Sequence, residues 1–478
     1  MDNKMKLLNV LGSMVVAVIA IIGLKIQLGE AQLFPNAVKV PTPSAGISER
    51  RLWTLDGPRA LGYYGRIMAI YPLQGIINGQ EVNDLLISVH FRADQNKQSL
   101  PDLVARISST DGSVVWSKEL RLDQTDTKLD IDHDGLADVV GISDDHVTIL
   151  KGANGEVFWS SVEEVNDHLT TVNYNEHKYI VAIYEFPQGD QSKINFYDFD
   201  INGVLQPPMN PPQQLTEAFL SLNIGENASN GKPIVMAASK TSNTIYLFDL
   251  AGAQTGVQGS FADWSLVDAS LAVNRGKDPG KDIVLAGDEG GASSIIRYDL
   301  SNLAQHYWIS PDAGENGNFT ASAVTPSMNG DSWEDILLRR DPETVILLDG
   351  QTGKKLWEYS GKDSAFGNFN YLTATNPISE NKNIYPYVFI GQSTSDYVLA
   401  IDGVSGQETY FFRAANPQTA IFAHENKLFA ASGMDESSPY ELLTKNTVLE
   451  AFEMTPMDPK VQLQQLKKPL ASPGIKVK

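Results

Sequence analysis

Nine consecutive residues, Asp130 to Asp138, have the residue types and spacing of a metal-binding loop. They read DIDHDGLAD, with carboxylates at the first, third, fifth and ninth positions and glycine at the sixth. Calcium loops take oxygen ligands at such positions, use the glycine for a sharp reversal and add the backbone carbonyl of the seventh residue. A solvated Asp-rich turn is the alternative. The sequence therefore predicts Ca²⁺ bound by Asp130, Asp132, Asp134, Leu136 and Asp138.

This loop differs from an EF-hand, which carries Glu at its twelfth position and has helices on both sides. Here the twelfth residue is Gly141, and the loop runs into the apolar Val139-Val140. We therefore expect a calcium loop that leads into a β-strand.

Other Asp-rich turns retain parts of the pattern. The turn from Ser327 to Asp335 keeps Asn329, Asp331 and Asp335 at the third, fifth and ninth positions, so these residues are weaker candidate calcium ligands. Asn78-Gly79 with Asp84 retains less. In such turns the last Asp is expected mainly to accept hydrogen bonds from loop amides.

The elements around these turns follow a repeat of about 50 residues. Each repeat contains a short apolar strand, a second strand, a turn with Gly or Asn, and a further strand that often ends in an aromatic residue. Apolar runs without polar alternation suit inner strands buried on both faces, and one repeat matches a four-stranded propeller blade. The runs begin at Asp84, Asp138, Tyr179, Pro233, Asp282, Asp335, Tyr387 and Lys427. The sequence therefore predicts an all-β, eight-bladed β-propeller, with seven blades as the alternative.

The two ends of the repeat region are expected to close the ring. The last repeat has a strand at Asn446–Phe452 and lacks the outer strand, while Leu52-Trp53-Thr54 resembles the outer strands of other repeats. We predict that this segment completes the last blade, because closure removes exposed strand edges. Tryptophans at one repeated position are expected to pack between blades rather than to stack a ligand. They are Trp116, Trp159 and Trp357.

The D-G-x-T-G-x-x-x-W phrase at Asp349 to Trp357 resembles the repeats of pyrroloquinoline-quinone (PQQ)-type propellers. The Asp-rich turns resemble the calcium loops of FG-GAP/VCBS-like propellers. The resemblance covers about Arg51 to Glu453 and implies the fold rather than an activity, because propellers host many unrelated functions. The chain has no cysteine, so it cannot form the vicinal disulfide that quinoprotein dehydrogenases of this fold class often carry.

The N-terminal residues predict a location outside the cytoplasm. Lys4 and Lys6 precede the uncharged segment Leu7–Leu24, which is just long enough to span a bilayer and longer than a usual signal-peptide core. We expect an uncleaved membrane anchor, with a cleaved signal and a secreted protein as the alternative. The predicted domains are a signal-anchor or signal peptide (1–31), a linker (32–48), the propeller (49–453) and a disordered basic tail (454–478).

Composition narrows the function. The formal net charge of −21 repels phosphate backbones, so no nucleic-acid partner is expected. The sequence contains no nucleophile elbow, zincin helix or Walker loop. We therefore expect a non-catalytic binding or assembly module at the cell surface or in the periplasm, with a protein or glycan partner. Two alternatives stay open: a carbohydrate-active lyase or glycosidase that uses the central funnel, and a structural subunit of a cell-surface assembly.

Overall fold

The structure is a computed structural model. It describes residues 49–61, 64–93, 99–187, 191–226, 230–239, 241–260, 265–274, 281–289, 292–298, 306–310, 321–331, 333–341, 343–361, 369–375, 387–393, 395–415, 418–424, 427–432 and 447–454. The predicted N-terminal helix, the linker and the basic tail after Met454 lie outside these residues. Within the described ranges, no helix is long and apolar enough to cross a membrane.

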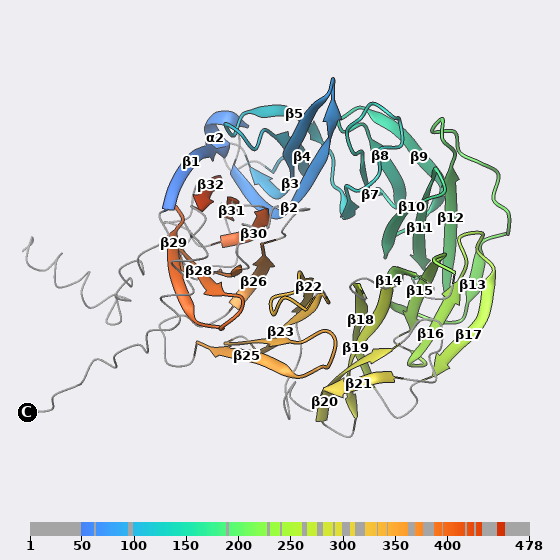
Figure 1. The fold of residues 1–478 in the computed structure, drawn as a ribbon. Helices are drawn as coiled ribbons and strands as arrows, with labels where there is room; N and C mark the ends of the chain where they lie inside the picture. The colour runs from blue at the N-terminus through green and yellow to red at the C-terminus, as the bar shows by residue number, and fades with distance from the viewer. Residues whose placement is uncertain are drawn as a thin grey trace, which may run out of the picture.

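Antiparallel β-sheets dominate the described chain, which also contains the short helix α2 (Gly57–Ala60). The described strands pair into six four-stranded sheets and one eight-stranded sheet, arranged in a propeller-like ring (Figure 1). The all-β prediction is therefore confirmed.

Three four-stranded sheets form the first part of the ring. They contain β2 (Tyr64–Ile77), β3 (Gln80–Ala93), β4 (Leu103–Ile107) and β5 (Val114–Glu119); β6 (Asp123–Asp126), β7 (Val139–Ser143), β8 (His146–Leu150) and β9 (Val157–Glu164); and β10 (Leu169–Tyr174), β11 (His177–Glu185), β12 (Ser192–Phe199) and β13 (Gln213–Leu215).

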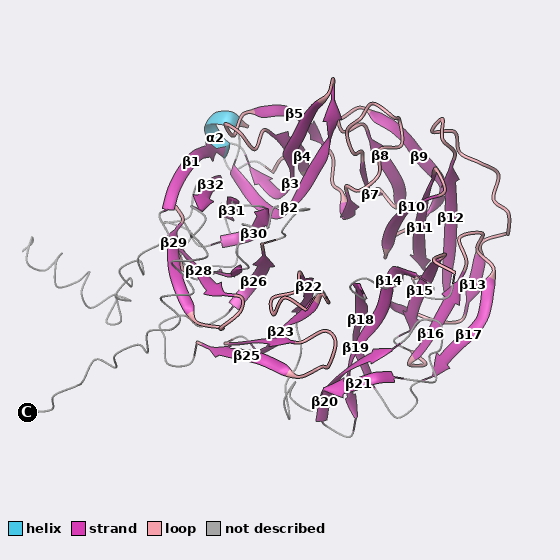
Figure 2. Cartoon of the chain, in the orientation of Figure 1, coloured by secondary structure: helices cyan, strands magenta, loops and turns pink. Residues whose placement is uncertain are grey.

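The eight-stranded sheet consists of two four-stranded groups, visible as separate sets of arrows in Figure 2. They are β14 (Phe219–Glu226), β15 (Pro233–Ser239), β16 (Thr244–Phe248) and β17 (Gln254–Ser260), followed by β18 (Ser265–Asn274), β19 (Lys281–Glu289), β20 (Ala292–Tyr298) and β21 (His306–Ser310). A single residue pair, Glu226 with Lys281, joins the two groups.

Three further four-stranded sheets complete the ring. They contain β22 (Ala321–Thr325), β23 (Asp335–Asp341), β24 (Thr344–Leu348) and β25 (Lys355–Ser360); β26 (Phe369–Ala374), β27 (Tyr387–Gln392), β28 (Tyr397–Asp402) and β29 (Glu408–Arg413); and β30 (Gln418–His424), β31 (Lys427–Ser432), β32 (Val448–Met454) and β1 (Glu49–Asp56).

The last sheet joins the two ends of the repeat region, as predicted. β1 pairs with β32 in an antiparallel register that sets Trp53 opposite Ala451. Buried Thr447 connects this sheet to the start of β2: its hydroxyl donates to the Gly65 carbonyl (2.6 Å) and accepts from the Gly65 N–H (2.6 Å). The prediction that the segment around Trp53 closes the ring is therefore confirmed.

The apolar runs predicted to be inner strands are the second strands of their sheets. In β6–β9, for example, the run is β7, which is buried along its whole length, whereas a partly exposed strand, β6, precedes it. A strand with hydrogen-bonded neighbours on both edges and a packed sheet on each face has no solvent-facing side, which explains the continuous apolar pattern. The first strand of each sheet escaped the sequence analysis because its pattern is mixed.

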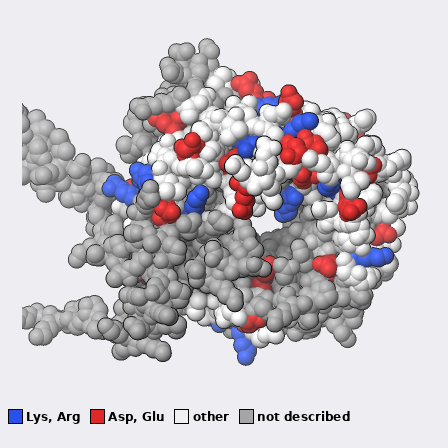
Figure 3. All heavy atoms as spheres, turned by 45° about the horizontal axis from the view of Figure 1, so that its top comes forward, with Lys and Arg blue, Asp and Glu red and all other residues white. Residues whose placement is uncertain are grey.

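Charged side chains of both signs are interspersed over the described part of the face drawn in Figure 3. On this described part of the face, acidic side chains do not gather into one patch.

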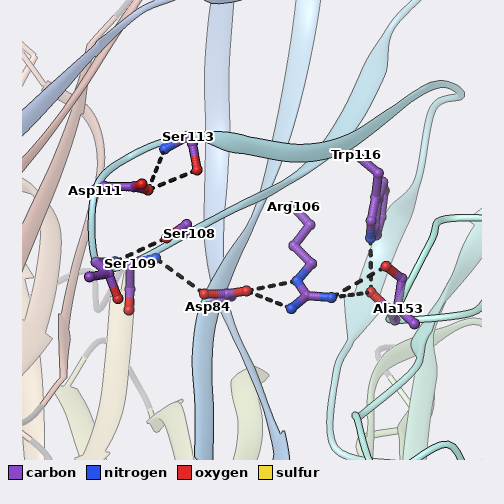
Figure 4. A network of polar contacts seen from close by, with 10 residues as sticks. Asp84, Arg106, Ser108, Ser109, Asp111, Ser113, Trp116 and Ala153 are labelled. Atoms are coloured by element: carbon purple, nitrogen blue, oxygen red, sulfur yellow. Dashed lines mark hydrogen bonds and ion pairs between the residues drawn. The ribbon is translucent and has the colours of Figure 1, made fainter. Parts of the chain in front are cut away.

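One turn residue connects the sheet β6–β9 to the sheet before it. The N–H of Gly152, between β8 and β9, donates to Asp138 Oδ1 (3.1 Å). The carbonyl of the same residue accepts from Trp116 Nε1 of β5 (2.8 Å), and Arg106 of β4 donates to it as well (3.3 Å; Figure 4). We call this set of contacts the inter-sheet link.

The inter-sheet link recurs around the ring. Between the closing sheet and β2–β5, the Ser109 N–H donates to Asp84 Oδ1 (3.3 Å) and the Ser109 carbonyl accepts from Trp53 Nε1 (3.0 Å). Between β20 and the sheet β22–β25, the Gly350 N–H donates to Asp335 Oδ1 (3.0 Å) and its carbonyl accepts from Arg297 (2.5 Å). Neighbouring sheets are therefore joined by directed hydrogen bonds as well as by apolar packing.

The repeated tryptophans pack between sheets, as predicted. Trp357 Nε1 donates to the Gly403 carbonyl of the next sheet (2.7 Å), and the Trp159 ring meets Tyr197 and Phe199 of the next sheet edge-on. Gly155 has a positive φ of 74°, and a Cβ there would lie 2.6 Å from the Trp116 ring. The turn glycine is therefore required both for its backbone conformation and for the close approach of the indole.

Because the Thr447 hydroxyl connects the closing sheet to β2, its removal should destabilise the folded chain. Thr447→Val leaves the N–H and carbonyl of buried Gly65 unpaired, so the free energy of unfolding should fall by about 1–3 kcal/mol. Thr54→Val, at an exposed position of β1, is the matched control and should change it by less than about 0.5 kcal/mol. Chemical denaturation measures both, and equal effects would contradict the proposed weight of this contact.

Candidate metal centre

Three of the four predicted carboxylates come together. One carboxylate oxygen from each of Asp130, Asp132 and Asp138 lies within 4.8 Å of the other two. Among the described residues, this is the one group of three or more His, Cys, Asp or Glu side chains with that proximity. Asp134 is not part of the group.

Asp138, the last residue of the loop, has a buried side chain that accepts hydrogen bonds from three backbone N–H groups. Its side chain is fully buried; Oδ2 accepts from the N–H groups of Ile131 (2.7 Å) and Asp132 (3.1 Å), and Oδ1 takes part in the inter-sheet link. Burial, followed by the nearby charge of Asp132, raises the pKa of Asp138 to about 7, although its three backbone donors favour the ionised form. A positive charge at this place would favour the carboxylate further.

Asp130 presents an oxygen without a partner. Its Oδ2 accepts from the Gly135 N–H (3.1 Å), but its buried Oδ1 has no hydrogen bond. Buried carboxylate oxygens normally have donors or coordinate a metal ion. The unpaired Oδ1, beside two further carboxylates, therefore fits a bound cation.

Asp132 already has a positive neighbour. Its side chain is 7% exposed, its Oδ1 accepts from the Asp134 N–H (3.2 Å), and its Oδ2 lies 3.4 Å from Lys151 Nζ. One ammonium thus faces a cluster with three carboxylates.

The two remaining predicted ligands serve the shape of the loop. Asp134 is exposed and accepts from the Leu136 N–H (2.8 Å). Leu136 is fully buried and forms a β-bridge with Gly75. The assignment of Asp134 and of the Leu136 carbonyl as ligands stays a prediction.

The loop forms two backbone hydrogen bonds with β2 of the preceding sheet, a contact that the sequence analysis missed. The Ile76 N–H donates to the Gly135 carbonyl (2.6 Å), and the Ala137 N–H donates to the Gln74 carbonyl (2.9 Å). A Cβ at Gly75 would lie 2.1 Å from the Gly135 oxygen, so only glycine permits this approach. Gly75 within a long strand was the available signal, since an isolated strand glycine marks a close backbone approach.

His133, at the fourth position of the loop, is not part of the carboxylate group. It is exposed, with a positive φ of 61°, and its ring nitrogens lie 2.8 and 3.1 Å from the Nζ of Lys178 on β11. The loop therefore contacts the following sheet as well as the preceding one.

The weaker loop, Ser327 to Asp335, satisfies its own carboxylates. The Asn329 amide donates to Asp331 Oδ2 (3.1 Å) and to Asp349 Oδ2 (2.7 Å), so an NH₂ group lies between two acidic side chains. Buried Asp335 accepts from the Met328 N–H (2.7 Å) and takes part in the inter-sheet link. Asp335 thus accepts loop amides, as predicted for the last Asp of such a turn.

Asp84, the last residue of the most degenerate loop, is held by an ion pair. Arg106 NH2 lies 2.7 Å from Asp84 Oδ2, and the guanidinium extends from there toward Ala153 of the next sheet (Figure 4). In this loop the Arg106 guanidinium supplies the positive charge beside the last Asp.

The raised pKa of buried Asp335 should make the stability of the folded chain depend on pH. Burial raises its pKa to about 6, against about 3.9 for Asp in an unfolded chain. The folded state therefore binds the proton more tightly, and stability falls as the pH rises from 4.5 to 7, by about 2 kcal/mol from this group. Asp335→Asn should remove that part of the slope, while exposed Asp144→Asn should retain it. Unfolding measured in chelator at several pH values tests this, and an unchanged slope in Asp335→Asn would contradict it.

No protein-family model matches the chain, and no curated protein matches it. Among solved structures, the chain is similar to BamB from Moraxella catarrhalis (13% identity, 81% of this chain and 97% of that one, TM-score 0.47). It is also similar to quinohemoprotein alcohol dehydrogenase from Comamonas testosteroni (11%, 86% and 78%, 0.49) and to the computationally designed Ika8 protein (14%, 84% and 99%, 0.48). The fold of this chain is defined by its strand pairing.

Proposed function

We propose that this chain is a non-catalytic, eight-bladed β-propeller that works outside the cytoplasm as a binding or assembly module, with a structural Ca²⁺ in the loop Asp130 to Asp138. The observation that carries the proposal is the unpaired, buried Asp130 Oδ1 beside Asp132 and Asp138. The two groups of the eight-stranded sheet, counted separately, support eight blades rather than seven.

Calcium suits this donor set because it prefers several carboxylate oxygens. Asp130, Asp132 and Asp138 would hold the ion. Its positive charge would balance the negative charge of the carboxylates, which Lys151 alone does not balance. Its binding requires ionised carboxylates, so calcium would favour the charged form of Asp138.

The role of the ion follows from what the loop touches. Gly135 donates its N–H to Asp130 and offers its carbonyl to Ile76 of β2, while Asp138 accepts from Gly152 in the inter-sheet link. A cation that fixes Asp130 and Asp138 would therefore brace the contact between two blades. This is a structural role, and it leaves the exposed loops free to bind a partner.

The binding role rests on the ring and on the N-terminal segment. A ring of sheets joined by inter-sheet links holds its loops in fixed positions, which lowers the ordering cost of an interface. The predicted anchor would place that ring at the cell surface or in the periplasm, with a protein partner ahead of a glycan as the preferred ligand.

Calcium should stabilise the full chain, purified in mild detergent. Ca²⁺ at a hundredfold excess over its Kd adds about 2.7 kcal/mol to the free energy of unfolding if it binds only the folded state. Asp130→Asn should remove most of this gain, because it neutralises the unpaired oxygen while leaving an acceptor for Gly135. Thermal unfolding with Ca²⁺ and with EGTA measures the difference.

Asp144→Asn is the matched control, an exposed Asp in the turn between β7 and β8 of the same sheet. It should keep the full calcium response. If the wild-type chain responds equally to Ca²⁺ and EGTA, the cluster is a solvated turn and the calcium part of the proposal is wrong.

One contact favours the alternative of a carbohydrate-active enzyme. Arg66 NH2 on β2 donates to the Tyr371 hydroxyl on β26 (3.3 Å), and β2 and β26 are both first strands that flank β30. An Arg–Tyr pair on such strands is a group that lyases can use for acid–base work. If this alternative holds, the chain cleaves a polysaccharide from a defined panel and Tyr371→Phe abolishes the cleavage; no cleavage by the wild-type chain rules it out for that panel.

A further inference from the structure

The segment Ile201–Thr216 follows β12 and includes β13. It contains no charged residue, although charged residues are 20% of the sequence and both signs appear on the described part of the face drawn in Figure 3. It lies at the outer edge of the ring (Figure 2). Interface cores are depleted of charge in the same way.

The segment exposes its apolar side chains to solvent. The exposed fractions are 52% for Ile201, 56% for Val204, 39% for Leu205 and 77% for Met209. Four prolines among them are exposed as well, namely Pro207, Pro208, Pro211 and Pro212. Neighbouring apolar residues exposed together indicate a surface that another molecule covers.

The segment is held in place at both ends. Asp200 Oδ1 accepts from the N–H groups of Asn202 (2.8 Å) and Val204 (3.0 Å), and Asp200 Oδ2 accepts from the Gln206 amide (2.9 Å). Further along, the Asn210 amide donates to the Ala251 carbonyl of the neighbouring sheet (2.8 Å). The exposed residues between these anchors are therefore presented in one arrangement, which reduces the entropy lost on binding.

We propose that Leu205–Pro212 is the docking segment for a protein partner that carries an aromatic-lined groove. The sequence LQPPMNPP contains two Pro-Pro pairs, and Pro208 and Pro211 have the P-x-x-P spacing. Proline-rich segments of this kind bind such grooves because proline rings pack on aromatic faces and little chain entropy is lost. This inference rests on the proposed binding role and assigns it a surface.

A lipid surface is the less favoured occupant. Segments that insert at a bilayer surface typically carry Trp or Tyr together with Lys or Arg, and Ile201–Thr216 has none of these. The net charge of −21 also opposes approach to anionic lipids. The chemistry of the segment therefore selects a protein.

The test is site-specific photo-crosslinking in the cells that produce the full chain. p-Benzoylphenylalanine replaces Met209 in one version and Val404, a 50% exposed residue in the turn between β28 and β29, in the control version. Adducts are identified by mass spectrometry. The identified partner is then purified, and its binding to the full chain is measured with and without a competing synthetic peptide of residues 201–216.

We expect one protein adduct at Met209, a partner with an aromatic-lined groove, and competition by the peptide. Combined Pro208→Ala and Pro211→Ala should weaken binding about tenfold or more, as removal of interface anchors does. Gln214→Ala, an exposed change in the same segment, should leave the affinity unchanged, and circular dichroism should show all variants folded.

Other results overturn the inference. A lipid adduct at Met209, or a partner whose affinity ignores the proline changes, would show that the segment does not dock a groove. A protein adduct from Val404 alone would overturn the docking segment and leave the binding role standing, whereas no adduct from either position would count against both.

Discussion

A single turn residue that uses both of its backbone groups joins neighbouring sheets, and the rest of the structure depends on this contact. Its N–H satisfies a buried aspartate of its own sheet, and its carbonyl accepts an indole or guanidinium from the preceding sheet, as Gly152 does for Asp138 and Trp116. Each sheet of a ring must bury both faces, so the polar groups in those interfaces need partners. The inter-sheet link supplies these partners and fixes the position of one sheet relative to the next.

The candidate metal centre is an elaboration of the same link. Asp84, Asp138 and Asp335 all accept a turn amide, but the groups that offset the nearby negative charge differ among the three. Arg106 pairs with Asp84, and the Asn329 amide lies between two acidic groups beside Asp335. Around Asp138, two further carboxylates converge and one oxygen stays unpaired. Lys151 supplies one positive charge beside Asp132, but Asp130 Oδ1 still has no donor, so a cation would suit this loop.

The ring and the exposed segment after β12 have complementary properties. The sheets of the ring are joined at several inter-sheet links, and the described part of the face drawn in Figure 3 mixes charges of both signs. The segment that carries Met209 is uncharged, exposes several apolar side chains and is anchored by Asp200 and Asn210. A ring that presents an anchored segment with exposed apolar side chains suits the proposed binding role.

The sequence by itself determined the repeat, the all-β class, the closing role of the strand at Trp53 and the spacing of the Asp130–Asp138 carboxylates, because each of these is a local pattern of residue types. Only the tertiary structure decided three further features. These are the first strands of the sheets, the close approach of Gly75 to Gly135, and the absence of Asp134 from the carboxylate group. These features depend on which backbone groups of distant segments meet, and Gly75 and Gly135 are 60 positions apart in the chain. Spacing within one loop therefore identified the candidate ligands, while contacts between sheets selected which of them converge.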